Sequence, residues 1–362
     1  MAMPKDKVKK IDIDELVRPN VLNFEPYRSA RDDFSEGILL DANENALGSP
    51  FESELELNRY PDPYQYELRK RFAEFRNINI EQVCAGVGSD EVIDLLVRIF
   101  CQPGRDRILS TPPTYGWYKV TAQFNNVYAD EVMLTPDFQL DTEKILEAVT
   151  GQTRMIFLCS PNNPTGNKLK SEDIETILDG FDGLVVVDEA YIDFAEEQSM
   201  AAKLDAYENL IVLQTLSKSF GLAGIRLGVA LASPAVIKWL MRVKPPYNVN
   251  KLTLHYAEKA FEPENLESAH KNIATLIEQR KRLASELEQL SGVEKVFPSD
   301  ANFLLVKVSN AYSVYQELAQ SGVIVRYRGH EPMCEDTLRI SVGTPEQNSI
   351  FLEKFKTILG GS

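Results

Sequence analysis

The chain has 362 residues, of which 44% are hydrophobic and 26% are charged. This composition is too apolar for a disordered chain, and the length allows one large domain and a smaller one. The 39 lysines and arginines against 54 aspartates and glutamates give a net charge of -15, which disfavours nucleic acid and anionic membranes as partners. We therefore expect a folded protein with a cleft between two domains.

The cysteines and the N-terminus bear on metal binding and on location. The four cysteines are widely spaced without a CxxC pair, so neither a metal site nor a disulfide framework is predicted. The lysine-rich N-terminus is followed by the acidic stretch IDIDELV, where a signal peptide would need an apolar core. No apolar run approaches the roughly 18 residues of a membrane span. These features predict a cytoplasmic protein whose basic first ten residues form a disordered arm.

Residues 81–240 alternate short β-branched runs with helical patterns, which is typical of a mostly parallel sheet flanked by helices. The clearest helix covers residues 90–100, and Ser89 is its expected N-cap. Continuous apolar runs at 183–187 and 210–213 predict central strands buried on both faces. The predicted helix over residues 90–100 has one apolar face, formed by Ile93, Leu96, Val97 and Phe100.

The C-terminal third predicts a second, smaller α+β domain. Residues 262–291 form one long amphipathic helical pattern. Three predicted strands follow it, at 302–308, 322–327 and 337–343. The Pro/Asn segment at 244–250 is the expected boundary. We therefore divide the chain into an N-terminal arm with part of the small domain (1–45), a large domain (46–250) and a small domain (251–362).

Three polar motifs follow predicted strands, at the sheet edge where open α/β sheets bind ligands. They are SPNNPTGN at 160–167, VVVDEAYIDF at 185–194 and TLSKSFGLAGIRLG at 215–228. Each motif also has an ordinary structural interpretation: a Pro/Asn/Gly turn, an acidic helix N-cap, and a solvated lysine in a loop. Their combination, however, favours one ligand.

Together the motifs supply what pyridoxal phosphate requires of a protein. The cofactor needs a lysine that binds its aldehyde, an acid at its ring nitrogen and donors at its phenolate oxygen. We assign these roles to Lys218, to Asp188, and to Asn163 with Tyr191.

The phosphate of the cofactor needs a cationic cradle. Arg226 and Ser217 supply it, and Ser89 adds the start of the helix over 90–100, a common position for an anion. Tyr115, at another strand end, is a candidate to stack on the ring. A core or loop position explains Tyr115 equally well.

The spacing of these residues resembles the aspartate-aminotransferase superfamily of pyridoxal-phosphate enzymes. Asp188 follows Asn163 by 25 residues, Lys218 follows Asp188 by 30, and Arg226 follows Lys218 by eight. More narrowly, the chain resembles the histidinol-phosphate aminotransferase family over residues 15 to 350. The motifs that carry the narrower resemblance are NFEPYRSAR (23–31), LLDANEN (39–45), NRYPDP (58–63), GSDE (88–91), VRY (325–327) and LRISVGTPEQN (338–348).

The resemblance implies the type I fold of pyridoxal-phosphate-dependent transferases, and further site residues. It adds Asp90 to the cofactor-binding residues, and it implies a homodimer in which Tyr60 reaches the cofactor phosphate of the partner subunit. A tyrosine in such a loop can equally pack on its own subunit. The implied substrate-binding residues are Tyr27, Asn43, Asn163, Arg326 and Arg339.

Two of these residues also have a physical rationale. Arg326 and Arg339 on adjacent strands would clamp a dianion, because guanidinium groups bind phosphate or carboxylate bidentately. Each is otherwise an ordinary surface arginine, and Asn43 could simply stabilise a turn.

The resulting hypothesis is an aminotransferase that interconverts histidinol phosphate and 2-oxoglutarate with imidazole-acetol phosphate and glutamate, using Lys218, Asp188 and Tyr191 as catalytic residues. The rivals are an aromatic amino-acid aminotransferase and a pyridoxal-phosphate lyase such as threonine-phosphate decarboxylase, which share the cofactor residues. A catalytically silent cofactor-binding module is the alternative from another class.

Overall fold

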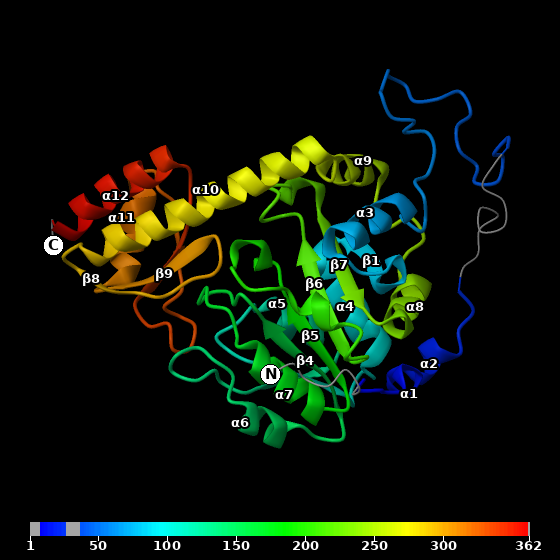
Figure 1. Cartoon of the computed structure of the whole chain (residues 1–362), viewed down its shortest axis with the longest axis horizontal. Coiled ribbons are helices and arrows are strands. Elements are labelled where there is room, and N and C mark those ends of the chain that lie inside the picture. The colour runs from blue at the N-terminus through cyan, green and yellow to red at the C-terminus, as the bar shows by residue number, and fades with distance from the viewer. Residues whose placement is uncertain (1–7, 27–36, 361–362) are drawn as a thin grey trace.

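The computed structural model describes residues 8–26 and 37–360. Its larger sheet has the strand order β1-β7-β6-β5-β4-β2-β3 (Figure 1). Neighbouring strands are parallel except at β7, which runs antiparallel to both β1 and β6. The strands are β1 (Val83–Val87), β2 (Arg107–Ser110), β3 (Tyr128–Glu131), β4 (Thr153–Cys159), β5 (Leu184–Asp188), β6 (Leu210–Thr215) and β7 (Leu227–Ala232).

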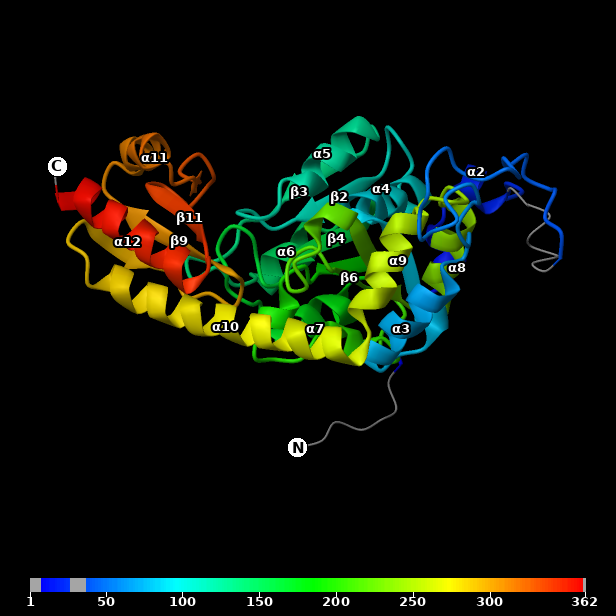
Figure 2. The same cartoon turned by 90° about the horizontal axis from the view of Figure 1, so that it is seen from above.

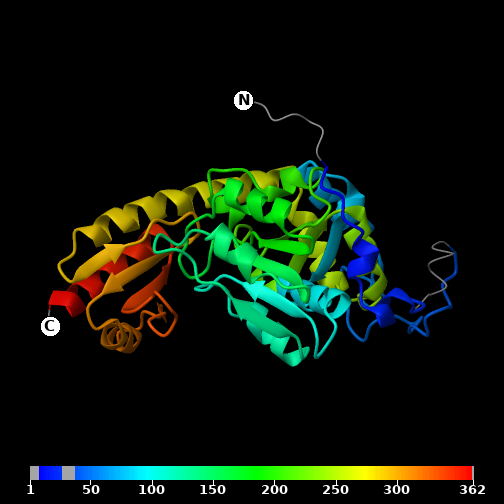
Figure 3. The ribbon, with the colours of Figure 1, turned by 90° about the horizontal axis from the view of Figure 1, so that it is seen from below.

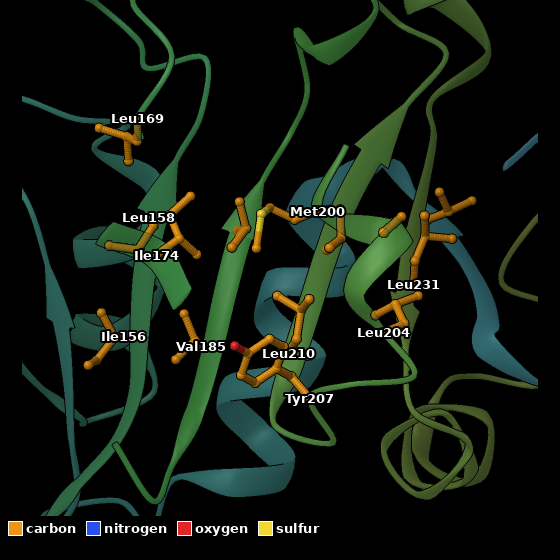
Figure 4. Packing of buried hydrophobic residues seen from close by; sticks show 14 of the residues in the cluster. Ile156, Leu158, Leu169, Ile174, Val185, Met200, Leu204, Tyr207, Leu210 and Leu231 are labelled. Carbon is orange, nitrogen blue, oxygen red and sulfur yellow. The ribbon is translucent and has the colours of Figure 1, made fainter. Parts of the chain in front are cut away.

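Alternating side chains of the central strands supply two apolar layers. In β4, Ile156 and Leu158 belong to one buried cluster, whereas Met155 and Phe157 belong to the other. Figure 4 shows the first cluster, in which Ile156, Leu158 and neighbouring strands' side chains lie against Ile174. Burial on both faces explains the continuous apolar runs in the sequence.

Helices cover both faces of this sheet. One face carries α3 (Tyr66–Arg76), α6 (Thr142–Ala148), α7 (Ser171–Gly180) and α9 (Lys251–Ala260). The other carries α1 (Ile13–Leu16), α2 (Pro19–Leu22), α4 (Gly88–Phe100), α5 (Trp117–Phe124) and α8 (Pro234–Val243). Short 3-10 turns are η2 (Ile80–Gln82), η3 (Ile192–Phe194), η4 (Met200–Lys203) and η5 (Ala223–Ile225).

The smaller sheet is antiparallel, in the order β10-β11-β9-β8. Figure 2 shows α10 running from the large domain along the small one, where α11 and α12 complete the helical layer. The elements are α10 (Pro263–Glu288), β8 (Val293–Val296), β9 (Phe303–Val308), α11 (Ala311–Gln320), β10 (Arg326–Tyr327), β11 (Thr337–Ser341) and α12 (Pro345–Gly360). An α/β fold with a mostly parallel sheet and a smaller α+β domain is therefore confirmed.

Several local predictions need correction. Ser89 is not the N-cap of α4, because the helix begins at Gly88 and its cap is Val87, whose N–H donates to a Glu91 carboxylate oxygen at 2.6 Å. The strand predicted over 322–327 shortens to the two residues of β10.

The N-terminal arm also differs from expectation where the structure describes it. Lys9 donates from Nζ to the carbonyl oxygens of Leu178 and Phe181, both at 2.7 Å, and so ties the chain to the end of α7. The helices α1 and α2 pack on the large domain, at the end away from the small domain (Figure 3). Described residues 8–22 therefore pack on the large domain, while the division at residue 250 stays a prediction.

Candidate active site

A cavity of about 440 Å³ lies between the carboxyl ends of β4, β5 and β6 and the strands β10 and β11 of the small domain. It brings together most residues that the motifs predicted, although they are far apart in sequence. They are Ser89, Asp90, Tyr115, Asn163, Asp188, Tyr191, Ser217, Lys218, Arg226, Arg326 and Arg339.

Asp188 is the last residue of β5 and is almost fully buried. Its Oδ2 accepts a hydrogen bond of 2.7 Å from the Tyr118 hydroxyl, and its Oδ1 accepts one of 3.2 Å from the Ala190 N–H. Burial raises the pKa of Asp188, and these two hydrogen bonds oppose the shift. The carboxylate is thus oriented and desolvated, which suits a partner that carries a positive charge.

Lys218 enters the same cavity from the loop after β6, and its Nζ lies 5.6 Å from the centre of the Tyr191 ring. Burial lowers the pKa of Lys218 and the nearby Arg339 lowers it further, while Asp188 opposes both. An amine with a lowered pKa is more often neutral, and only the neutral form is a nucleophile or base. Burial also raises the pKa of the Tyr191 hydroxyl, which keeps that group a hydrogen-bond donor.

The start of α4 and Arg226 form a site suited to an anion. The Arg226 guanidinium lies over Gly88, where a Cβ would meet Nη2 at 2.8 Å, and the φ of +73° at this position favours glycine. Arg226 pairs with Asp90 at 3.3 Å, and the Tyr115 hydroxyl donates to the same carboxylate at 3.1 Å. Ser89 and Ser217 line the same end of the cavity. The cradle thus combines a cation, hydroxyl groups and free helical N–H groups, the donor set that phosphate requires.

The opposite end of the cavity belongs to the small domain. Arg339 on β11 donates to the Asn163 side-chain oxygen at 2.5 Å and therefore connects the two domains. Arg326 on β10 lies directly opposite Arg339 in the antiparallel pair. Burial lowers the pKa of Arg339, and the neighbouring arginines Arg328 and Arg326 lower it further. This end of the cavity is therefore also suited to an anion, and it is separate from the cradle at α4.

The structure adds residues that the sequence reasoning missed. Arg328 lines the cavity, and its signal was the alternation along the strand, which puts residues 326 and 328 on the same side. Cys159 and Thr215 also line it, at the ends of β4 and β6. Tyr118 had no local signal, because its bond to Asp188 joins residues that are 70 apart in the chain.

Two of the predicted residues line a different hollow, and a third lies outside the described residues. Tyr60 and Asn43 line a different hollow of about 470 Å³, where the Tyr60 ring stacks on Tyr247 at 4.5 Å. Tyr27 lies outside the described residues. The described part of this chain therefore builds the cavity without Asn43 and Tyr60.

Comparisons with known proteins agree with this architecture. The family model "Aminotransferase class I and II" matches residues 31–355. The chain is 48% identical to histidinol-phosphate aminotransferase of Flavobacterium johnsoniae, covering 96% of this chain and 99% of the relative, and 46% identical to that of Parabacteroides distasonis, covering 96% and 99%. The crystal structure of the histidinol-phosphate aminotransferase from Clostridium acetobutylicum shares the fold, with a TM-score of 0.78 and 22% identity, covering 84% of this chain and 92% of that one.

Within the described residues no helix combines the length and apolar character needed to cross a membrane. A family match over nearly the whole chain, together with relatives of such identity, leaves one assignment. This chain belongs to the aminotransferase class I and II family.

Proposed function

We propose that this chain is a pyridoxal-phosphate-dependent aminotransferase that interconverts histidinol phosphate and 2-oxoglutarate with imidazole-acetol phosphate and glutamate. The observation that carries the proposal is the single cavity with an anion site at each end and Lys218 and Asp188 between them. One end suits the phosphate of the cofactor and the other the anionic end of a substrate. The names and high identity of the relatives support the same substrate.

The cavity fits the cofactor residue by residue. Arg226, Ser89 and Ser217 would hold its phosphate, and Asp188 would hold its ring nitrogen. Asn163 and Tyr191 would donate to its phenolate oxygen. When bound, the cofactor supplies an aldehyde that links to an amine and a ring that accepts the electrons of the adjacent carbon.

The residues of this chain then control proton transfer. Asp188, buried and oriented by Tyr118, keeps a proton on the ring nitrogen, an electrostatic contribution to the reaction. Lys218 would bind the aldehyde of the cofactor through Nζ, and its neutral amine would serve as general base and acid for the proton transfer. Arg326 and Arg339 orient the substrate by its anionic end, which positions its amine near Lys218.

The rival activities differ at the substrate end of the cavity. An aromatic aminotransferase would hold a carboxylate and a ring there, and a lyase would release carbon dioxide instead of transferring the amino group. Steady-state turnover with histidinol phosphate, phenylalanine and tyrosine separates the two aminotransferases. A higher kcat/KM for either aromatic amino acid than for histidinol phosphate would overturn the proposed substrate.

The role of Lys218 has a direct test. In Lys218→Ala, borohydride reduction should leave no cofactor attached to the protein by mass spectrometry, and transamination should fall by several orders of magnitude. Lys203→Ala, a half-exposed lysine paired with Glu175, is the matched control and should retain both properties. Covalent attachment in the Lys218 variant would show that another amine binds the aldehyde. Turnover by the wild-type protein is the separate observation that excludes a silent cofactor-binding module.

We further propose a homodimer with shared sites. Described residues 37–60 project beyond the large domain (Figure 1), and this segment exposes Ile38, Leu40, Leu47 and Phe51. Several large apolar side chains exposed on one short segment are typical of a protein interface. The same segment carries Asn43 and Tyr60, and a partner's cavity is where they would act. We also propose a cytoplasmic location, which the four free, buried cysteines favour.

A further inference from the structure

We propose that Arg328 makes the substrate end of the cavity selective for a dianionic phosphate over a monoanionic carboxylate. The inference rests on the proposed function and deepens it, because Arg326 and Arg339 alone would serve either kind of anion. Arg328 is the third arginine on the same wall of the cavity.

The strand geometry brings the three guanidinium groups together. Arg326 lies opposite Arg339, and the Arg328 N–H donates to the Thr337 carbonyl at 2.9 Å, which continues the pairing by two residues. Side chains two residues apart share one face of a strand, so Arg328 lies on the cavity side and diagonal to Arg339. Tyr327, between them, faces the opposite way and packs against the Tyr312 ring at 5.2 Å.

Like charges placed across a strand pair destabilise the sheet. Burial lowers the pKa of Arg339 most, and among the neighbouring cations Arg328 lowers it more than Arg326 does. Arg326 is exposed on this wall, whereas Arg328 and Arg339 are partly buried. A cluster of like charges lining a cavity is typical of a ligand site, because the ligand supplies the missing counter-charge.

The local charge balance matches a dianion. Among the described residues, Arg328 pairs with Glu331 at 2.5 Å, and no carboxylate lies within ion-pair distance of Arg326 or Arg339. Three arginines and one glutamate leave two positive charges. A phosphate monoester near neutral pH carries up to two negative charges, whereas the side-chain carboxylate of glutamate carries one.

The pairing with Glu331 also fixes the position of Arg328. Both side chains are largely buried, at 15% and 18% exposed, so the guanidinium group is held and desolvated rather than mobile. Its Nε is buried and finds no acceptor in the described part of the chain. That Nε is closed off from the cavity, so an anion would be bound by the other guanidinium nitrogens, and a preorganised, partly desolvated guanidinium group binds an anion more strongly than a solvated one.

The test compares Arg328→Gln, Arg328→Lys and wild type in both half-reactions. We expect Arg328→Gln to lower kcat/KM for histidinol phosphate about tenfold or more, as for one lost charge-assisted contact, and for glutamate by less than about threefold. Arg328→Lys should recover part of the loss because it retains the charge. Arg339→Ala, by contrast, should lower both values.

A binding measurement makes the result independent of catalysis. Calorimetry on the holoenzyme would use the des-amino analogue of histidinol phosphate and the same molecule without its phosphate. Arg328→Gln should weaken only the phosphate-bearing probe. The matched control is Arg282→Gln, which removes an arginine from a similar pair with Glu286 on α10, outside the cavity.

The outcomes separate the two proposals. Equal losses for histidinol phosphate and glutamate, unchanged binding of the phosphate probe, or the same change in Arg282→Gln would each overturn the role of Arg328. Absence of wild-type turnover with histidinol phosphate would overturn the proposed function instead, and the calorimetric comparison would still report on Arg328.

Discussion

At the scale of single residues, the site uses groups that are costly to the folded protein. Asp188 is buried at the end of a strand, and Lys218 and Arg339 are held near other cations. Each has its pKa shifted toward the uncharged form, mainly by burial. Such positions are retained because a bound ligand supplies the opposite charge.

The effect of Asp188 on the free energy of unfolding can be measured in the cofactor-free protein. The pKa of Asp188 is raised in the folded state above the ordinary 3.8 of the unfolded chain. At pH values between the unfolded-state pKa and the folded-state pKa, the folded chain therefore binds more protons than the unfolded chain. Stability therefore falls as the pH rises through this range, and the ionised Asp188 destabilises the protein at neutral pH. We expect Asp188→Asn to have a higher free energy of unfolding at pH 7 than wild type, with the difference shrinking as the pH approaches 3.8.

Urea unfolding at several pH values checks this expectation. The same variant should bind the cofactor less tightly, because a neutral amide gives no charge to a protonated ring nitrogen. A lower stability of Asp188→Asn at pH 7, with no pH dependence of the difference, would mean that Asp188 is mainly a structural acceptor for Tyr118.

At the scale of elements, the phosphate cradle depends on how closely β7 approaches the start of α4. A Cβ on Gly228 would lie 2.2 Å from the Ser89 nitrogen and 2.3 Å from the Gly88 carbonyl carbon. These are backbone atoms, which cannot move aside by changing a rotamer. Gly228 in β7 therefore sets the position of the helix that offers its N–H groups to the anion.

Gly228→Ala should push α4 away from β7. We expect a loss of about 1–3 kcal/mol in the free energy of unfolding, as for other overpacked sites, together with weaker cofactor binding. Gly224→Ala in η5 is the control, because its Cβ would meet no atom within 4 Å. Urea unfolding and cofactor titration measure both effects, and equal behaviour of the two variants would contradict the close-approach argument.

Helices and strands were predicted well from the sequence where burial of one or both faces dictates the pattern of apolar residues. The apolar face of α4, with Ile93 and Leu96 fully buried, and the central strands β5 and β6 follow directly from periodicity. The residues after strands were found because parallel strands gather their ends at one edge. Local chemistry was less reliable. Ser89 is a good N-cap by type, yet the Val87 N–H donates to the Glu91 side chain and the helix starts two residues earlier than predicted.

The parts of the site that were missed depend on contacts between distant segments. Tyr118 reaches Asp188 from α5, a contact that exists only once α5 packs on the sheet. Arg328 was detectable by strand alternation, but its pairing with Glu331 and its place in the cavity follow from the turn after β10. Spacing along the chain carries no information on such contacts.

At the scale of the whole molecule, the cavity exists because two domains are joined across it. The Asp300 N–H donates to the Gly166 carbonyl at 2.8 Å, and the Lys168 N–H donates to the Asp300 carboxylate at 2.8 Å. These bonds link the loop after β4 to the small domain, beside the contact of Arg339 with Asn163. The small-domain end of the cavity and the loop that carries Asn163 are thereby held together.

The homodimer with shared sites predicts a specific recovery of activity. If Tyr60 serves the cavity of the partner, Tyr60→Phe and Lys218→Ala chains each form impaired homodimers. A mixed dimer then contains one cavity with an intact Lys218 and with Tyr60 supplied by the Lys218→Ala chain. Co-expression with two different tags isolates this mixed dimer, and its kcat/KM should reach about half that of wild type, since one cavity of two is intact.

The result separates the two positions open to Tyr60. In the described chain its ring stacks on Tyr247 of the same subunit, and its N–H donates to Glu44, so an intrasubunit role is a real alternative. If Tyr60 acts within its own chain, the mixed dimer has one cavity lacking Lys218 and one lacking Tyr60. Its activity would then stay at the average of the two impaired parents. Tyr247→Phe, which keeps the stacking partner, serves as the control for a purely structural effect.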